Sequence, residues 1–418
     1  MRKRLRKITD NNVHLAFIFT GLQGFGRGVW MGNILSLYIV ILAEKSEPLF
    51  GLAPNELLGI TSGITGIAMT ALVFPSGFLA DKYSRDTMLK AASWIGAAAM
   101  LLLMFAGSIY AIFIAMFLWG AFQGLSRPAF EAIFADSVPS GKRSGVYAKI
   151  HLTDQIAMAV GPFMNVGLFF ILGDEWNIVT LRSIMYFGVF FSLLSAVMLQ
   201  LFKDSRTLGD ESESMLTTKD NANSDKDPNG KAKKIAYLLV GSNLIVGMGA
   251  GMTVKFFPVF FRAVYEMKPI SVQIVMGTTL IMTGLFGIIA QKFSESKGRV
   301  EIMLAVKLLA TVCLFIIAYY PPLIILLPLF VLRGSLMNSA QPLSRSILMD
   351  TVPKKHRGKW NSVETISWGL FWNASAVIGG FLIGDNNFRL CFLVTSGIYL
   401  VGSIPIILLI PLVRKENT

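Results

Sequence analysis

The sequence is poor in charged residues for a chain of 418 residues. Asp, Glu, Lys and Arg together make up 15% of it, whereas hydrophobic residues make up 54%. In soluble domains about one quarter of the residues are charged, so this chain has too few polar side chains to cover a surface that faces water throughout. The composition excludes an ordinary soluble protein and favours an integral membrane protein, whose helices face lipid.

The sequence also has few of the residues that carry metal, redox or nucleotide chemistry. Its two cysteines, Cys313 and Cys391, lie in apolar segments and offer no disulfide framework. Its three histidines are far apart and have no metal-ligand spacing. The glycine-rich stretch GFGRG lies within an apolar run and lacks the Gly-Lys-Ser/Thr of a phosphate-binding loop. We therefore expect no metal, no cofactor, no enzymatic activity and no ATP-driven step.

Long apolar runs fill most of the chain. Each reaches the length of about 20 residues that a helix needs to cross the hydrocarbon core. Glycine and proline occur within these runs, which membrane helices tolerate. We predict an all-α integral membrane protein with twelve transmembrane helices, at residues 13–43, 55–80, 87–106, 109–137, 145–172, 179–202, 235–262, 270–292, 300–319, 322–350, 359–384 and 388–412.

The net charge of +13 comes mainly from short basic clusters between the apolar runs. No continuous basic face with interleaved aromatic residues is present, so nucleic acid is not an expected partner. If the runs cross the membrane alternately, most loop Lys and Arg residues fall on the side of the N-terminus. This bias identifies that side as cytoplasmic, so both termini are predicted to be cytoplasmic. The basic residues on the other side are Lys45, Arg182, Arg262, Lys268 and Arg389.

Residues 203–234 form a long polar segment that does not fit a membrane. They are rich in Asp, Glu, Ser, Asn and Lys and cannot bury enough apolar surface to order themselves. We interpret them as a cytoplasmic linker between an N-terminal half, residues 1–202, and a C-terminal half, residues 235–418. A plain tether is favoured over a binding or phosphorylation tail.

The two halves carry an internal repeat. At a shift of 214 residues, Asp136 falls on Asp350, and both copies close a long helix with Asp-x-Val-Pro and a basic loop. A second match, at a shift of 210, places GFLADKYSR on GIIAQKFSE, so that Arg85 falls on Glu295. Because both halves begin on the same side of the membrane, the repeats are parallel and related by an axis along the membrane normal.

The segment GFLADKYSRDTML, which follows the second predicted helix, resembles the signature of the major facilitator superfamily. Ser84 replaces the usual glycine of that signature, and Asp86 replaces a usual basic residue. Together with the twelve spans, the linker and the parallel repeat, the resemblance covers nearly the whole chain. It implies two six-helix bundles and a secondary transporter working by alternating access, but not a particular substrate. The matching residues are Gly77, Asp81, Lys82 and Arg85.

The resemblance also implies a cytoplasmic gate. A charge-assisted network at the cytoplasmic helix ends would hold one conformation and break in the other. The alternative is that these charges are solvated and only determine topology. The predicted gate residues are Gly77, Asp81, Arg85, Asp136 and Arg345.

Charges inside the spans are costly unless they are paired or face water. The resemblance places the first, fourth, seventh and tenth helices around the cavity, and Glu131 is the only acid well inside them. An electropositive cavity favours an organic anion. The alternative is that the cations have structural partners, Arg27 with Asp154 and Arg127 with Glu131. The predicted substrate or coupling residues are Arg27, Asn33, Arg127, Glu131, Asp154, Lys255 and Arg333.

We therefore expect a multi-pass transporter that acts as a monomer in the lipid bilayer on a small-molecule substrate. The sequence does not identify the coupling ion. If transport is coupled to protons, Glu131 and Asp154 are the candidate carriers, because burial beside cations suits that role. Lys307, on the peripheral ninth helix, is expected to snorkel. The alternative function is a transport-inactive receptor or scaffold that keeps the fold. Such a protein would have no need of the buried charges that this chain retains.

Overall fold

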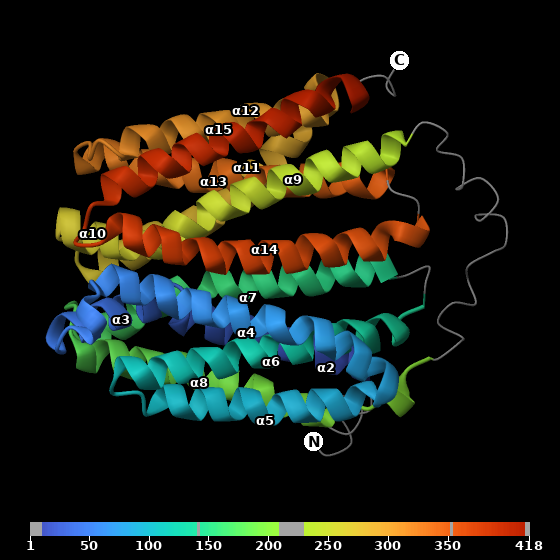
Figure 1. Cartoon of the computed structure of the whole chain (residues 1–418), viewed down its shortest axis with the longest axis horizontal. Helices are drawn as coiled ribbons and strands as arrows, with labels where there is room; N and C mark the ends of the chain where they lie inside the picture. The colour runs from blue at the N-terminus through green and yellow to red at the C-terminus, as the bar shows by residue number, and fades with distance from the viewer. Residues whose placement is uncertain (1–10, 140–142, 209–229, 352–353, 414–418) are drawn as a thin grey trace. The chain divides into compact units, whose positions relative to one another are not determined.

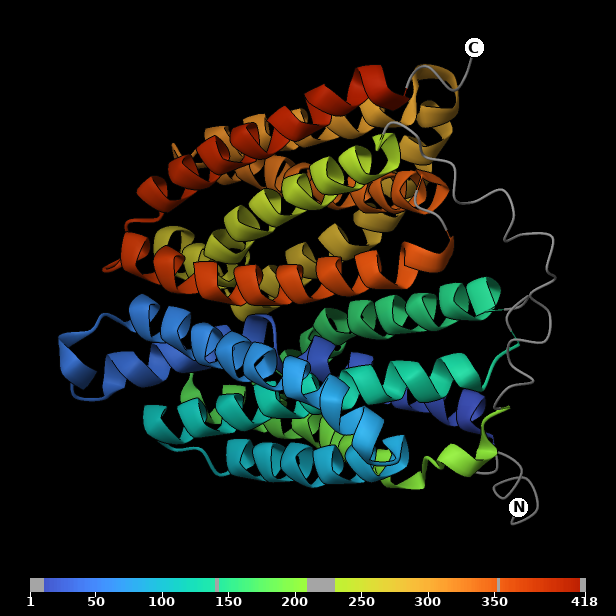
Figure 2. The same cartoon turned by 45° about the vertical axis from the view of Figure 1, so that its right-hand side comes forward.

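The structure is a computed structural model that describes residues 11–139, 143–208, 230–351 and 354–413. Every regular element in these ranges is a helix. The chain divides into two compact units, which are Met1–Asp220 with Lys268–Ile270, and Asn221–Met267 with Ser271–Thr418. Figure 1 and Figure 2 draw the first unit in blue to green, apart from Lys268–Ile270, and the second unit in yellow-green to red.

Helices of the first unit are joined by short loops, and polar side chains begin several of them. Asn11 accepts from the Val13 N–H and Asn177 accepts from the Thr180 N–H, each at 2.8 Å. Such N-caps satisfy donors that have no partner inside the helix. The helices are α2 (Asn12–Trp30), α3 (Asn33–Lys45), α4 (Pro54–Lys82), α5 (Arg85–Met104), α6 (Ile109–Asp136), α7 (Arg143–Leu172) and α8 (Ile178–Met198).

The second unit repeats this order of helices. Gly298 separates the third and fourth helices of this unit with a φ of 97°, a conformation that favours glycine. The helices are α9 (Lys231–Thr253), α10 (Phe257–Tyr265), α11 (Pro269–Lys297), α12 (Arg299–Ile317), α13 (Leu323–Thr351), α14 (Lys354–Ile383) and α15 (Phe388–Val413), with the 3-10 turn η7 (Val254–Phe256) between α9 and α10.

Membrane-spanning segments account for nearly all of this structure. By length and composition, 11 of the described segments can cross a membrane, with Asn12–Lys45 and Lys231–Tyr265 each counted as one. The twelfth is α14, whose described side chains include the shorter apolar stretch Gly369–Ile383. The predicted all-α, twelve-helix membrane architecture is therefore confirmed.

The first segment of each unit is interrupted partway, which the sequence did not predict. In the first unit α2 ends at Trp30, and α3 begins at Asn33 after Gly32, whose backbone is not helical (φ −74°, ψ −81°). In the second unit α9 passes into the turn η7 and then into α10, whose first turn contains Pro258. Proline has no N–H to continue the ladder. The two longest spans are thus discontinuous helices at corresponding positions (Figure 1).

Glycines allow a neighbouring helix to touch the backbone just before each break. A Cβ added at Gly28 on α2 would lie 2.5 Å from the Met158 carbonyl oxygen of α7. A Cβ at Gly251 on α9 would lie 2.1 Å from the Trp372 carbonyl oxygen of α14. Only glycine fits at such a distance, and small residues at membrane helix contacts permit this close approach. The glycines therefore fix where α7 crosses α2 and where α14 crosses α9.

The structure corrects one part of the internal repeat. Helices α5 and α12 begin at Arg85 and Arg299, which are 214 residues apart, as are Asp136 and Asp350. The match of Arg85 with Glu295 is therefore wrong. It arose because GIIAQKFSE lies inside α11, which continues to Lys297 before Gly298 ends it.

Candidate functional site

An ion pair lies one turn before the break in the first unit. Arg27 Nη2 donates to Asp154 Oδ1 at 2.7 Å, and the two side chains are 24% and 25% exposed. A Cβ at Gly24 would lie 2.9 Å from the same carboxylate oxygen, so glycine leaves the room that Asp154 occupies. Of the two alternatives for Arg27, the described structure contains the pair with Asp154.

Side chains around this pair hold the end of α2 in place. Asn165 on α7 donates its Nδ2 to the Val29 carbonyl oxygen at 3.0 Å. Carbonyls in the last turn of a helix lack an intrahelical partner, and the buried amide supplies one here. Trp30 donates its Nε1 to Ser192 Oγ at 2.9 Å and packs edge to face on Trp119. The end of α2 before the break is therefore held in place by hydrogen bonds and ring packing.

A lysine lies within the break of the second unit. Lys255 belongs to η7, and its Nζ donates to Asn373 Oδ1 of α14 at 2.8 Å. No carboxylate lies within ion-pair distance of Lys255 among the side chains that the structure describes. The ammonium group thus has a neutral amide as its partner, and its charge is not cancelled locally.

Among the charged site residues whose side chains the structure describes, Arg333 on α13 is the most deeply buried, at 5% exposed. Its Nη2 donates to the Tyr399 hydroxyl at 2.9 Å, and its guanidinium carbon lies 4.9 Å from the centre of the Phe257 ring. It forms no ion pair within the described ranges. A cation over an aromatic face is stabilised without a carboxylate. Arg333 therefore lies inside the second unit, with its guanidinium group against the ring of Phe257.

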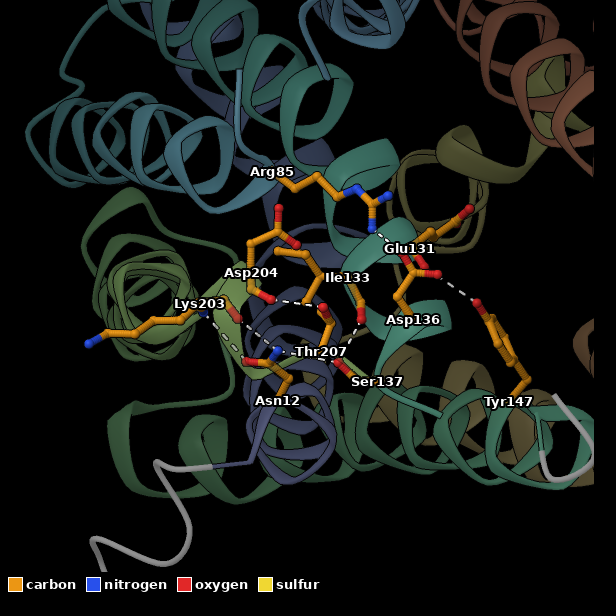
Figure 3. Close-up of polar contacts among 10 residues, drawn as sticks. All are labelled: Asn12, Arg85, Glu131, Ile133, Asp136, Ser137, Tyr147, Lys203, Asp204 and Thr207. Atoms are coloured by element: carbon orange, nitrogen blue, oxygen red, sulfur yellow. Dashed lines mark hydrogen bonds and ion pairs between the residues drawn. The ribbon is translucent and has the colours of Figure 1, made fainter. Parts of the chain in front are cut away.

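A second ion pair joins two helix ends in the first unit. Arg85, the first residue of α5, donates to Asp136, the last residue of α6 (Figure 3). Arg299 and Asp350 form the same pair between α12 and α13, and in both pairs the partners are 51 positions apart. Sequence reasoning missed Arg299 because it relied on the shift of 210. The shift of 214, applied to Arg85, would have found it.

The remaining predicted residues are placed as follows. Arg127 Nε lies 3.7 Å from Glu131 Oε1, and both side chains are more than half exposed, so this intrahelical pair is weak. Arg345 is exposed, and Asn33 is buried at the start of α3. The surroundings of Gly77 and the side chain of Asp81 lie outside the described part of the chain.

The prediction that Lys307 snorkels is wrong. Its side chain is 5% exposed, and α12 packs against both α13 and α15. A snorkelling lysine needs a path along the helix surface to the interface. At this position the helix faces protein on two sides, which the sequence pattern of α12 did not reveal.

A family model for the Major Facilitator Superfamily matches residues 16–236 and 239–418. Over 169 residues, 39% of this chain, the sequence is 31% identical to a Na(+), Li(+), K(+)/H(+) antiporter of Planococcus maritimus. The chain covers 38% of that antiporter's length.

Solved structures of similar fold include a D-xylose-proton symporter and a bacterial homologue of the iron transporter ferroportin. The symporter has a TM-score of 0.71 at 14% identity, with 94% of this chain and 96% of that chain covered. The ferroportin homologue has a TM-score of 0.70 at 13% identity, with 95% and 98% covered. At these identities the likeness shows the fold alone.

Proposed function

Because the chain belongs to the major facilitator superfamily, and is thus a membrane transporter and not an enzyme, we propose that it carries a small organic anion together with protons by alternating access. The two halves, residues 1–202 and 235–418, are the moving bodies in this proposal. Both termini and the linker between the halves are cytoplasmic, as the distribution of loop Lys and Arg residues indicates. The functional unit is a monomer.

The observation that carries the proposal is the break in the first helix of each half, with a cation beside it. Discontinuous helices at corresponding positions of two repeats mark the substrate site in transporter folds. Arg27 stands one turn before the break in α2, and Lys255 stands in the break after α9. The ends of a broken helix also carry partial charges that act on a ligand. Each break is therefore a candidate substrate-binding position within its own unit.

The balance of charge at the two breaks supports an anionic substrate. Lys255 has a neutral amide partner, and Arg333 adds a second positive charge from behind Phe257. Asp154 alone among the described acids pairs with a cation at a break. A carboxylate or phosphate group would supply the missing negative charge, and the fork of Arg27 matches the geometry of either group.

Proton coupling follows from competition for one guanidinium group. While Asp154 is ionised, it occupies Arg27 at 2.7 Å. Once Asp154 takes up a proton, its attraction for Arg27 falls, and Arg27 can bind the carboxylate of the substrate. Each anion is then carried with a proton. In this mechanism Asp154 is the proton carrier. Glu131, which is more than half exposed beside Arg127, has a lesser role.

The ion pairs Arg85–Asp136 and Arg299–Asp350 are proposed as a cytoplasmic gate with one member in each half. Asp81 remains part of this proposal through the family signature. Arg345 is exposed, and no ion pair holds it in the part of the chain that the structure describes. It therefore has the weakest support of the predicted gate residues.

A second candidate function is exchange of monovalent cations for protons. It is favoured by the identity of 31% over 169 residues to the Na(+), Li(+), K(+)/H(+) antiporter. In that case Asp154 would bind cation and proton in turn, and Arg27 would set its affinity. The partial coverage of that relative leaves the anion proposal as the one better supported by the site.

One reconstitution experiment separates these functions. Purified protein in proteoliposomes is tested for uptake of labelled mono- and dicarboxylates under an inward proton gradient. In parallel, release of protons from acid-loaded vesicles is followed with a pH dye on addition of Na⁺, Li⁺ or K⁺. Gradient-driven carboxylate uptake supports the proposal. Cation-driven proton release without carboxylate uptake supports the antiporter. Absence of both activities would overturn both proposed substrate classes.

A further inference from the structure

The first residues after α8 are folded against the end of α6. A 3-10 turn, η3, ends at Leu201, and Lys203–Leu208 then form a short segment that we name the strap. The strap contains the turn η4 (Asp204–Arg206), and Thr207 donates its hydroxyl to the Asp204 carbonyl oxygen at 2.8 Å. At its far end the Leu208 N–H donates to the Asp136 carbonyl oxygen at 2.9 Å. The start of the predicted linker is thus docked on the residue that pairs with Arg85.

A single asparagine ties the strap to two helices. Asn12, in the first turn of α2, is 1% exposed. Its Nδ2 donates to the Lys203 carbonyl oxygen at 3.0 Å and to Ser137 Oγ at 3.2 Å, and its Oδ1 accepts from the Lys203 N–H at 3.5 Å. Figure 3 shows this amide between the strap and the end of α6. A buried amide with these partners holds three separate segments in one geometry.

The corresponding ion pair of the second unit, Arg299–Asp350, serves as a comparison, because the described residues there include no strap. Asp136 is 32% exposed in its pair with Arg85, whereas Asp350 is 63% exposed in its pair with Arg299. The two arginines differ little, at 33% and 36%. The carboxylate of Asp204 also acts electrostatically on Arg85, which adds a second acid to the first pair. The strap therefore accompanies a more enclosed pair on one side of the repeat only.

We propose that Asn12 and the strap are positioning residues for the Arg85–Asp136 pair, so that the start of the linker sets how readily this pair opens. This inference rests on the proposed function only in treating the pair as a gate. Asn12 holds Lys203 and Ser137 together, and the strap then holds the backbone of Asp136. Without that hold the last turn of α6 frays, as helix ends do, and the carboxylate loses its fixed place opposite Arg85.

The test is hydrogen–deuterium exchange of the full-length protein in four forms: wild type, Asn12→Ala, Asp136→Asn and the double variant. Asn12→Ala is expected to raise the exchange rate of the Leu208 amide about tenfold. A factor of this size corresponds to the loss of roughly one net hydrogen bond. The variant is also expected to raise exchange in the peptide at 85–91, although Asn12 has no bond there. Asp136→Asn should raise exchange in that peptide too, and the double variant should exceed Asp136→Asn alone by less than twofold, because the two changes act through one pair.

Asn243→Ala is the matched control. Asn243 donates its Nδ2 to Ser344 Oγ at 3.1 Å in the second unit, the same chemistry as the bond from Asn12 to Ser137. Its loss is expected to leave exchange at 203–208 and 85–91 unchanged. If Asn12→Ala does not fold, Ser137→Ala removes one bond of the same amide and is expected to raise exchange in both peptides by a smaller factor.

Unchanged exchange at 85–91 in Asn12→Ala, or in Ser137→Ala where that variant replaces it, overturns the proposal. The proposal is also overturned if the factors by which Asn12→Ala and Asp136→Asn raise exchange at 85–91 multiply in the double variant. The readout does not need a substrate. A coupled exchange pattern in a protein that transports nothing would leave the strap standing and remove the proposed function.

Discussion

Asp154→Asn is the substitution that best tests the competition for Arg27. The amide keeps the shape of the carboxylate and can still accept a hydrogen bond from Arg27, but it cannot be ionised or carry a proton. In the proposed mechanism the variant resembles the protonated state permanently. It should therefore bind the anion and exchange it across the membrane, yet fail to use a proton gradient to accumulate it.

The structure sets the size of the expected effects. Breaking a buried ion pair costs about 3–5 kcal/mol, and breaking an exposed pair costs about 0–1 kcal/mol. The Arg27 and Asp154 side chains are 24% and 25% exposed, which places this pair between those limits. We expect a loss of about 2 kcal/mol in the free energy of unfolding. Substrate affinity should rise by about tenfold, because a charge-assisted hydrogen bond of about 1.5 kcal/mol no longer competes for Arg27.

Two assays on the same preparation separate these effects. Thermal unfolding in detergent, with and without substrate, measures stability and binding. Counterflow and gradient-driven uptake in proteoliposomes measure exchange and accumulation. Gradient-driven accumulation at the wild-type level in Asp154→Asn would refute the role of Asp154 as carrier. Loss of substrate binding would refute the competition for Arg27, since a freed guanidinium should bind the anion more tightly.

The gate pairs, the bond between Arg333 and Tyr399 and the distribution of loop charges give three further predictions. Asp136→Asn is expected to change the transport rate more than Asp350→Asn, because Asp136 is the more enclosed partner; equal effects on initial uptake rate would contradict this. Tyr399→Phe removes the hydroxyl that accepts from Arg333 and should lower the unfolding free energy by about 1–3 kcal/mol, so an unchanged melting temperature would count against it. Cysteines introduced at Ser214 and Asn386 should be labelled by impermeant maleimide from opposite sides of the membrane, and labelling of both from one side would contradict the predicted topology.

Much of the helical framework could be predicted from sequence, because each span is an apolar run of sufficient length. The breaks could not, because glycine inside a membrane helix is as compatible with a straight helix as with an interrupted one. Gly32 comes shortly after the four glycines of α2, at Gly21, Gly24, Gly26 and Gly28, and local sequence alone does not distinguish it from them. Only the packing of α7 against α2 shows where the chain turns.

The candidate site was predictable as a set of residue types but not as a set of contacts. The sequence identified Arg27 and Asp154 as costly charges, yet left open whether they meet, because it does not say which helices approach each other. The signal was present in Gly28 and Gly161, whose backbones nearly touch between α2 and α7. The prediction for Lys307 was wrong for the same reason. The sequence of α12 is apolar all round, so it does not show which face of the helix packs against its neighbours.

The glycine crossings have a mechanical consequence for each half. Where two backbones touch, no side chain can be inserted or withdrawn, so α2 and α7 can rotate about Gly28 and Gly161 but cannot slide past each other without a clash. The crossing of α9 and α14, at Gly251 and Gly379, is built in the same way. Each crossing therefore behaves as a pivot of fixed depth. Bending within a half is then concentrated in the few residues that follow the crossing glycine. In the second unit these residues include Lys255, and in the first unit they come directly after Arg27 and Gly28.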